Sequence, residues 1–358
     1  MSLITAHIDT NALQHNLKQV REFAPNSRVM AMIKANGYGH GLVPVAQALA
    51  DADALGVARI DEGLELRAAG IDNTIVLMEG VFSADELQTA ARENFQIVIH
   101  QPQQLELLQT ISLDKPIPVW LKLDTGMHRL GFALEDTQTV YQQLQQCDSV
   151  ADDIRLMSHF ANAEITGDNY TSEQCRRFQT AIEGLTGEVS LANSAAILRW
   201  SDTHADWVRP GLMLFGVSPL AEQSGAELNL QPAMTLKANI IAVKSLRAGA
   251  PVGYDGIWRA PTAMNIAIVA AGYGDGYPWR IAQNTPVLLN GKHATIVGRV
   301  SMDMLAIDLR GHESVTVGDA VTLWGEGLPV EDIARYANTI PYCLLTAVTR
   351  RVGFDYKN

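Results

Sequence analysis

The sequence has few cysteines, no long hydrophobic run and no cluster of basic residues. Its three cysteines, Cys147, Cys175 and Cys343, are odd in number and show no paired spacing. This pattern excludes a disulfide framework and a zinc site built on cysteine pairs, and it fits a reducing compartment. Polar or charged residues interrupt every apolar run well before about 18 residues, so we expect no membrane-spanning segment.

Positive charge is also scarce. The 358 residues include 27 Lys and Arg against 39 Asp and Glu, a net charge of −12 with no Lys/Arg run. We therefore expect neither nucleic acid nor an anionic membrane surface as a partner. Residues 1–9 have no basic start, long apolar stretch or small-residue cleavage site, so we expect no secretory signal. With 47% hydrophobic residues, the chain is predicted to be a cytoplasmic globular protein.

Short apolar runs rich in Val, Ile, Leu and Met recur through the first part of the chain. There are eight, at 29–33, 54–58, 74–78, 95–99, 119–123, 154–157, 189–192 and 208–215. Helix-like stretches with apolar residues at three- and four-residue spacing lie between most of them, at 42–49, 61–69, 84–93, 102–110 and 172–185. Ser83 and Thr171 are predicted to cap two of these helices.

Eight buried strands that alternate with helices are typical of a (β/α)8 barrel. A doubly wound open sheet is the alternative, because a strand count from one sequence can be wrong by about one or two. After residue 225 the apolar runs, at 234–243, 264–270, 285–289, 294–300, 304–309 and 320–324, are separated by glycine-rich turns. Asn290-Gly291 predicts a hairpin, and one helix is expected at 330–336. We therefore predict a barrel over residues 1–225 and a mainly-β domain over residues 226–358.

Polar residues follow several predicted strands, where barrel enzymes place their functional groups. Lys34 directly follows the first run and precedes three glycines. A lysine that leaves an apolar strand is easily desolvated, which lowers its pKa and makes it a Schiff-base candidate. A solvated strand-end lysine is the plainer interpretation.

The other candidate site residues can each also be explained by a purely structural role. Arg209 lies inside an apolar run and needs a partner, which a structural ion pair would supply. His159 is more often a core histidine than a functional one. Lys122 and Asp124 share a strand face, where a local salt bridge is the simpler expectation. Tyr254 would by itself be a turn aromatic.

Taken together and in order, these motifs resemble those of the alanine racemase family, whose members are pyridoxal-phosphate-dependent enzymes. The matching segments are Lys34-Ala-Asn-Gly-Tyr38-Gly-His-Gly, Lys122-Leu-Asp-Thr-Gly-Met-His-Arg129-Leu-Gly, His159-Phe-Ala, Asn193-Ser194, Arg209-Pro-Gly211-Leu212, Gly253-Tyr254, Gly272-Tyr-Gly-Asp-Gly-Tyr277, Gly298-Arg-Val-Ser-Met302-Asp303 and Tyr342. The resemblance extends from the first predicted strand almost to the end of the chain. It implies a barrel followed by a β domain, and it implies interconversion of L- and D-alanine, which supplies D-alanine for peptidoglycan.

The resemblance also implies a role for each matching residue. Lys34 would hold pyridoxal phosphate covalently and move a proton on one face of the substrate, and Tyr254 would move a proton on the other face. A tyrosine has a reference pKa of about 10, so its site must favour the phenolate. Arg209 would face the pyridine nitrogen, and His159 would pack against the ring.

The remaining roles concern the phosphate and the substrate. The phosphate would be bound by Tyr38, Ser194, Gly211, Leu212 and Tyr342, and Asn193 would also belong to the cofactor site. Arg129 and the backbone N–H of Met302 would take the substrate carboxylate. Lys122 matches a lysine that some members carry as a carbamate. Ser301 departs from relatives that have cysteine there, without a mechanistic consequence that we can identify.

A head-to-tail homodimer follows from the same resemblance, because in the family the β domain of one subunit completes the site of the other. Three alternatives stay open on the sequence. They are a racemase of serine or of a broader set of amino acids, a non-catalytic pyridoxal-phosphate carrier on a similar barrel, and a decarboxylase of basic amino acids. The second domain speaks against the carrier, and cysteine-based and acidic substrate motifs of the decarboxylases are missing.

Overall fold

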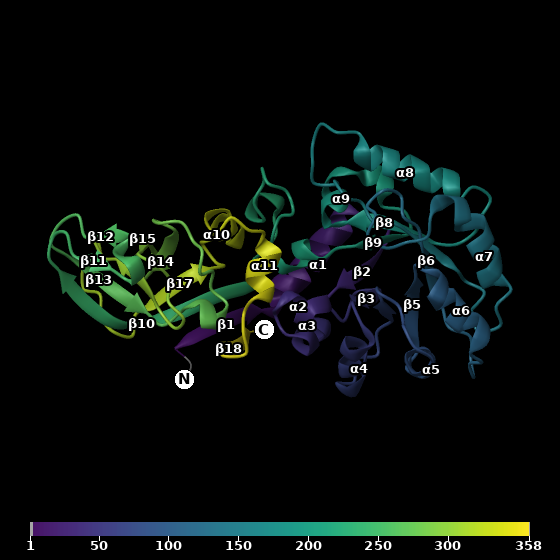
Figure 1. The fold of residues 1–358 in the computed structure, drawn as a ribbon, viewed down its shortest axis with the longest axis horizontal. Coiled ribbons are helices and arrows are strands. Elements are labelled where there is room, and N and C mark those ends of the chain that lie inside the picture. Colours follow the sequence, from purple (N-terminus) through teal and green to yellow (C-terminus); the bar gives the residue numbers. More distant parts are fainter. Residues whose placement is uncertain (1–2, 358) are drawn as a thin grey trace.

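The structure is a computed structural model that describes residues 3–357. It consists of a barrel and a β domain that lie side by side and give the molecule an elongated shape (Figure 1). The two parts have separate hydrophobic cores. Trp120 and Phe95 are among the largest buried side chains of the barrel core, and Trp324 stacks on Tyr277 in the β-domain core with ring centroids 5.8 Å apart.

Eight parallel strands close the barrel, each hydrogen-bonded to the next and the last to the first. They are β2 (Arg28–Met32), β3 (Ala54–Val57), β4 (Ile75–Leu77), β5 (Phe95–Ile99), β6 (Val119–Lys122), β7 (Arg155–Met157), β8 (Val189–Asn193) and β9 (Trp207–Arg209). All eight predicted strands are confirmed, and the closed ring excludes the open sheet. The eighth is shorter than expected because Pro210 has no N–H to extend the ladder, and the chain turns into the 3-10 helix η3 (Leu212–Phe215).

Helices surround the barrel (Figure 1). They are α3 (Leu42–Ala48), α4 (Ile60–Ala68), α5 (Ala84–Arg92), α6 (Pro102–Thr110), α7 (Thr137–Gln145), α8 (Tyr170–Ala181) and α9 (Ser194–Arg199), with the 3-10 turns η1 (Leu134–Asp136) and η2 (Ser201–Thr203). The Ser83 hydroxyl accepts a hydrogen bond from the Glu86 N–H at 3.2 Å, which confirms the predicted cap. The prediction for Thr171 is wrong, because Thr171 lies inside α8 and Asn169 precedes that helix.

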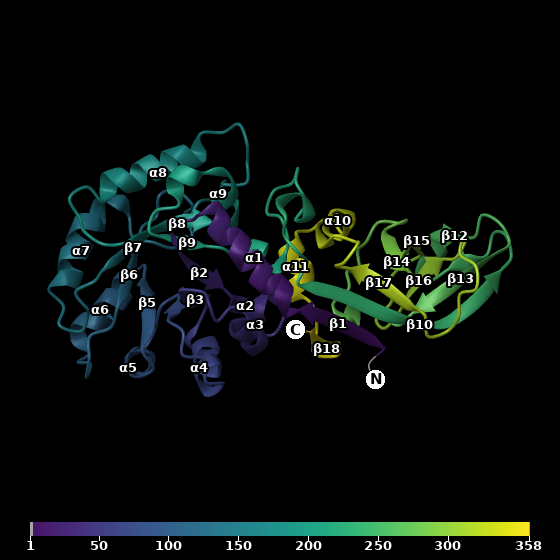
Figure 2. The same ribbon diagram turned by 180° about the vertical axis from the view of Figure 1, so that it is seen from behind.

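The first strand, β1 (Ile4–Asp9), belongs to the β domain and not to the barrel. It pairs antiparallel with β10 (Met234–Leu246) and parallel with β18 (Gly353–Lys357). The predicted division at residue 225 therefore needs a correction, since residues 4–9 of the predicted barrel part lie in the other sheet. The helix α1 (Thr10–Phe23) then leads into the barrel, and the two ends of the chain lie close together (Figure 2).

The rest of the β domain is built on antiparallel strands. They are β13 (Met264–Val269), β14 (Pro286–Leu289), β15 (Lys292–Val297), β16 (Leu305–Asp308) and β17 (Ala320–Trp324), with the small pair β11 (Pro251–Val252) and β12 (Trp258–Arg259). Strand β10 pairs with both β17 and β13, so these strands form a closed ring. The predicted Asn290-Gly291 hairpin is confirmed, with both residues at positive φ between β14 and β15.

Two helices lie in the C-terminal domain, where the sequence predicted one. The predicted helix is α10 (Val330–Tyr336), and the missed one is α11 (Pro341–Thr346). Short 3-10 turns complete the part after the barrel, at η4 (Ala226–Leu228), η5 (Tyr254–Gly256) and η6 (Tyr273–Asp275). Among the helices of residues 3–357, none combines the length and the apolar character that crossing a bilayer requires.

Candidate active site

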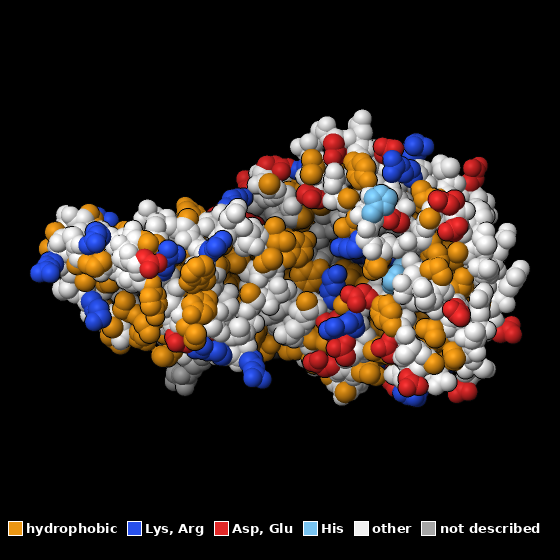
Figure 3. Space-filling view, in the orientation of Figure 1, with side chains coloured by type: hydrophobic (Ala, Val, Ile, Leu, Met, Phe, Trp, Pro, Cys, Tyr) orange, Lys and Arg blue, Asp and Glu red, His pale blue; other side chains and the backbone are white. Residues whose placement is uncertain are grey.

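The carboxyl ends of the barrel strands bring most of the predicted site residues to one end of the barrel. Those at or just after a strand end are Lys34, Lys122, His159, Asn193 and Arg209. The charges of Arg209 and Arg129 lower the pKa of both Lys34 and Lys122, as expected of cations that lie close together. On the surface, Lys and Arg side chains gather in a hollow between the barrel and the β domain (Figure 3).

Lys34 begins α2 (Lys34–Tyr38), a single turn that directly follows β2. Burial lowers the pKa of the Lys34 ammonium, and the nearby Arg129 lowers it further. The carboxylates of Glu79 and Glu62 act in the opposite direction. A lysine with a lowered pKa has a larger share of free amine at neutral pH, which is the form that attacks a carbonyl or takes a proton.

The turn that carries Lys34 is left-handed. Ala35, Asn36 and Gly37 have φ of 53°, 56° and 59°, and Tyr38 continues at 52°. A left-handed conformation costs an L-residue about 1–2 kcal/mol, so this turn needs support from its surroundings. Strain of this kind is typical of functional sites.

Glu62, on α4, supplies that support. One of its oxygens accepts hydrogen bonds from the backbone N–H of Ala35 at 2.7 Å and of Asn36 at 3.4 Å. Its other oxygen accepts from the N–H of Ala58 at 2.8 Å. The Asn36 side chain in turn accepts from the Leu42 N–H at 2.9 Å. Glu62 therefore positions the lysine turn from the neighbouring strand–helix unit.

Tyr38 is buried and lies between two aromatic rings. Its ring stacks on Phe215 with centroids 4.8 Å apart, and it approaches Tyr342 of α11 at 5.9 Å. Burial raises the pKa of both hydroxyls, that of Tyr342 to about 12. A Cβ added at Gly211 would collide with the Tyr38 hydroxyl, so only glycine allows this close approach.

Arg209 is 4% exposed and has no carboxylate partner in the described part of the chain. Its guanidinium donates to the Ser190 hydroxyl and the Ser158 carbonyl, both at 2.6 Å, and to the Leu191 carbonyl at 3.1 Å. Neutral oxygens thus satisfy the charge, and the structural ion pair considered above does not form. Burial lowers the pKa of Arg209 only to about 10, so it stays a cation at neutral pH.

His159 lies beside Arg209, with Nδ1 3.3 Å from the guanidinium. Burial and then the charge of Arg209 lower its pKa well below the usual value. The imidazole is therefore neutral at neutral pH, and Nδ1 accepts the hydrogen bond from Arg209. A flat, neutral ring at the mouth of the barrel is suited to packing against another flat ring.

Lys122 is 7% exposed, and the expected salt bridge with Asp124 does not form. Instead the Asp124 carboxylate accepts from the N–H of Gly126 and of His128, which holds its own turn in place. Burial, followed by the charge of Arg209, lowers the pKa of Lys122 to about 7.

Arg129 is exposed and makes no hydrogen bond within residues 3–357, so its guanidinium is free to bind an anion.

Asn193 and Ser194 begin α9. The Asn193 side chain accepts from the Ala196 N–H at 3.0 Å and so caps the helix. The buried Ser194 hydroxyl accepts from the Gly211 N–H at 2.9 Å, which joins the end of β8 to the segment before Leu212. Because Gly211 also approaches the Tyr38 hydroxyl, this hydrogen bond connects the start of α9 to the Tyr38 side of the site.

Two predicted residues are not brought to this site within one chain. Tyr254 is 69% exposed on η5, between β11 and β12 at the end of the β domain away from the barrel (Figure 1). Met302 is 52% exposed in the loop between β15 and β16, and its N–H has no partner among the described residues. Its carbonyl accepts from the Gly274 N–H at 2.8 Å, which fixes the loop.

Sequence reasoning missed several residues that hold the site together. Glu62 was visible only as one of two acids in a helix's first turn, and Ser190 and Phe215 only as members of apolar runs. The acidic pair was a usable signal, because Asp61 and Glu62 lie in the first turn of the helix that follows β3. Nothing in the local sequence indicated the contacts of Ser190 or Phe215.

Comparisons with known proteins cover the whole chain. The alanine racemase N-terminal domain matches residues 8–219, and the alanine racemase C-terminal domain matches residues 233–356. A protein of Shewanella loihica named alanine racemase is 49% identical over 97% of this chain and 97% of its own length. One of Escherichia coli, named biosynthetic alanine racemase, is 47% identical over 99% of both chains.

Solved structures agree with these matches. The crystal structure of biosynthetic alanine racemase from Pseudomonas aeruginosa superimposes with a TM-score of 0.96 at 42% identity over 100% of both chains. The alanine racemase of Acinetobacter baumannii gives 0.93 at 41% identity, also over 100% of both chains. With both domains matched and the fold shared along its whole length, the chain belongs to the alanine racemase family.

Proposed function

We propose that this chain interconverts L-alanine and D-alanine with pyridoxal phosphate as its cofactor. Membership of the alanine racemase family supports the reaction and the cofactor. The observation that supports the proposal most strongly is the position of Lys34 at the mouth of the barrel. It lies there near cations, and its lowered pKa makes its amine reactive. The biosynthetic name of the Escherichia coli relative supports D-alanine supply for peptidoglycan as the role.

The residues at the barrel mouth fit the cofactor. The hydroxyls of Tyr38 and Tyr342 have no hydrogen-bond partner among residues 3–357, although Tyr38 is only 8% exposed. Both hydroxyl oxygens are accessible and free to donate, and the oxygens of a phosphate are acceptors that they could bind. We assign the phosphate to Tyr38, Tyr342, the Ser194 hydroxyl and the backbone around Gly211 and Leu212, with Asn193 holding the start of α9.

When bound, pyridoxal phosphate withdraws electrons from the Cα of the amino acid and so weakens its bond to hydrogen. Racemisation then requires a proton to leave one face of Cα and a proton to be returned to the other. We assign these faces to the Lys34 amine and the Tyr254 hydroxyl. In each direction one group takes the proton as a base, and the other donates one as an acid.

Arg209 is assigned to the ring nitrogen of the cofactor. A guanidinium donates hydrogen bonds and does not give up its proton to the ring, so the nitrogen stays unprotonated. An unprotonated nitrogen would make the bound cofactor a weaker electron sink, and Arg209 would in this way limit transamination. The neutral His159 is assigned to the face of the ring.

The substrate carboxylate is assigned to the exposed Arg129 and the free N–H of Met302. Lys122, buried beside cations and with a pKa near 7, has the free amine that bonds to CO₂ with loss of a proton. The resulting carbamate would be an anion among cations and would orient Arg129. We propose that Lys122 carries this modification.

A homodimer completes the site in this proposal. Tyr254 and Met302 are exposed on the β domain, and Tyr254 lies away from the barrel mouth of its own chain. A head-to-tail dimer would bring both residues of a second copy to Lys34. Two equivalent sites would result, each with residues from both copies.

A racemisation assay followed by circular dichroism tests the proposed activity. Protein with bound cofactor, checked by its absorbance, would be given L-alanine, with L-serine and L-lysine in parallel. We expect the L-alanine signal to decay to zero faster than the others. Bound cofactor without decay on any amino acid would contradict the racemase assignment, and faster decay of L-serine would favour the broader specificity.

A further inference from the structure

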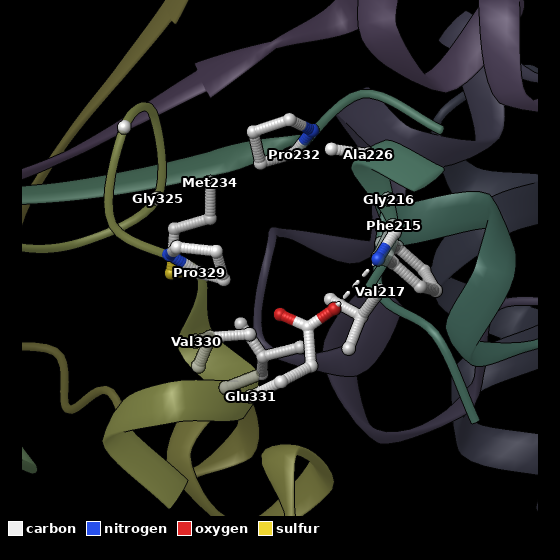
Figure 4. Close-up of a pocket in the computed structure, with 13 residues that line it drawn as sticks. Phe215, Gly216, Val217, Ala226, Pro232, Met234, Gly325, Pro329, Val330 and Glu331 are labelled. Atoms are coloured by element: carbon white, nitrogen blue, oxygen red, sulfur yellow. Dashed lines mark hydrogen bonds between the residues drawn. The ribbon is translucent and has the colours of Figure 1, made fainter. Parts of the chain in front are cut away.

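A partly enclosed cavity of about 250 Å³ lies between the barrel and the β domain. One side is formed by the segment after β9, including Phe215 and Val217, and the other by the start of α10 (Figure 4). None of the residues assigned to the racemase site lines it.

Glu331 is the single charged side chain that lines this cavity within the described chain. It is 8% exposed, and its Oε1 accepts from the N–H of Ser218 and of Gly225, both at 3.1 Å. Its Oε2 has no hydrogen-bond partner among residues 3–357. In Figure 4 this second oxygen is turned away from the bonded one, toward the side of Met234 and Pro329.

The rest of the wall is apolar or backbone. Phe215, Val217, Pro232, Met234 and Val330 contribute aliphatic and aromatic surface. No Lys or Arg among the described residues lines the cavity to neutralise Glu331. The unpartnered oxygen is not buried within the protein but is open to the cavity, and a cation that donates a hydrogen bond is the ligand that a carboxylate oxygen binds most strongly.

We propose that this cavity binds a small organic cation, an amine with a compact apolar body whose ammonium donates to Oε2 of Glu331. The apolar wall would bind the apolar body of the amine, because binding removes that surface from water. The carboxylate would favour a positively charged ligand over a neutral one. A neutral molecule of the same shape would leave Oε2 without a donor. An anion would be repelled.

The position of the cavity connects its occupant to the proposed racemase site. Phe215 lines the cavity and stacks on Tyr38, and Leu345 lines it from α11, the helix that carries Tyr342. An occupant would restrain both tyrosines. Resting on the proposed function, we expect it to tighten cofactor binding.

Calorimetric titration of the cofactor-loaded enzyme tests the site. The probe is N-ethylpiperidine, a tertiary amine that is cationic at neutral pH and cannot form an imine with the cofactor. The neutral N-acetylpiperidine has a similar body without the charge. We expect one amine to bind per chain. The amide should bind at least about tenfold more weakly, because a hydrogen bond to a charged group contributes free energy on that scale. No heat with the amine, or equal binding of both probes, would overturn the proposal.

Two variants separate the cavity from non-specific binding. Glu331→Gln keeps an oxygen for the N–H groups of Ser218 and Gly225 but removes the charge, so amine binding should fall about tenfold to hundredfold. Asp332→Asn removes the same charge from the next residue, which pairs with Arg335 and does not line the cavity, and should leave binding unchanged. Unchanged binding by Glu331→Gln would contradict the assignment. If that variant does not fold, the two probes on the unaltered enzyme still decide.

The racemase activity and cofactor affinity of the same preparation, measured with and without N-ethylpiperidine, separate the two proposals. Tighter cofactor binding in its presence supports the connection through Phe215. Amine binding with unchanged cofactor affinity would support the amine site in the cavity but would contradict its effect on cofactor binding. Amine binding in a preparation without racemase activity would contradict only the proposed function.

Discussion

Arg209 is a buried cation whose proposed role is to face the ring nitrogen of the cofactor. It is buried against the oxygens of Ser158, Ser190 and Leu191, with no carboxylate among its partners in the described chain. A carboxylate in its place would accept a proton or share one with the ring nitrogen of the cofactor. In the proposed site, the Arg209 cation gives up no proton and would leave that nitrogen unprotonated.

Arg209→Glu should therefore change the product ratio. A carboxyl group would allow protonation of the ring nitrogen, lengthen the carbanion lifetime and raise side transamination relative to racemisation by about tenfold or more. The measurement is pyruvate formed per alanine racemised. Arg155→Lys, on β7 and paired with Asp153 and Glu188, is the control and should leave the ratio unchanged. An unchanged ratio in Arg209→Glu would contradict the role assigned to the arginine.

Lys122 should make the free energy of unfolding depend on pH. With a folded-state pKa of about 7 against an ordinary 10.5, the unfolded chain binds more protons between these values. The free energy of unfolding should therefore fall as pH decreases from about 10 to 7, by on the order of a few kcal/mol, and not change further below that from this residue. Lys122→Met in CO₂-depleted buffer should flatten the profile, as measured by urea denaturation. An identical slope in both proteins would contradict the free-amine assignment.

Single residues were predictable where their sequence neighbours carried the signal. Lys34 follows an apolar run and precedes glycines, which is local information. The partners of Arg209 were not predictable, because they come from separate segments: the Ser158 carbonyl and His159 just after β7, and the Ser190 hydroxyl and Leu191 carbonyl on β8. Asp124 was expected to pair with Lys122, but the N–H groups of its own turn lie nearer.

At the scale of elements, the left-handed turn α2 is the unusual feature of the barrel. Three features support it: the Glu62 carboxylate that accepts from its N–H groups, the Asn36 side chain that accepts from the Leu42 N–H at the start of α3, and the glycine at position 37. A Cβ at Gly37 would lie 2.9 Å from Val45 Cγ2, so both the backbone and the packing require glycine there.

Gly37→Ala should destabilise the fold more than an ordinary glycine substitution at positive φ. Backbone strain of about 1–2 kcal/mol adds to the cost of overpacking against Val45, for a total of roughly 2–4 kcal/mol. Gly70→Ala is the matched control, with φ of 77° and nothing within 4 Å of the added Cβ, and should cost only the strain. Urea denaturation measures both, and equal losses would show that the α2 turn is not tightly packed.

Element prediction succeeded where periodicity was strong and failed where the partner was distant. The eight barrel strands and the hairpin at Asn290 were all predicted. The strand β1 was missed because its partners are β10 and β18, more than two hundred residues along the chain. The end of β9 was placed too late, since the apolar run continues past Pro210 although the ladder cannot.

At the scale of the whole molecule, the proposed site is divided between the two domains. Lys34, Arg209 and Tyr38 lie in the barrel, whereas Tyr254 and Met302 are exposed on the β domain. No pattern within one chain could predict this division, because the sequence does not specify which copy a residue serves. The resemblance to the family supplied that expectation, and the exposure of Tyr254 supports it.

The central claim is that Lys34 of one copy and Tyr254 of another act on the same substrate. A mixture of the inactive variants Lys34→Ala and Tyr254→Ala, allowed to exchange subunits, tests it directly. Half of the dimers would be hybrids, each with one complete site, so the mixture should recover about a quarter of the unaltered activity. Exchange is confirmed by tagging one variant and recovering the other with it. No recovery after confirmed exchange would contradict the shared site.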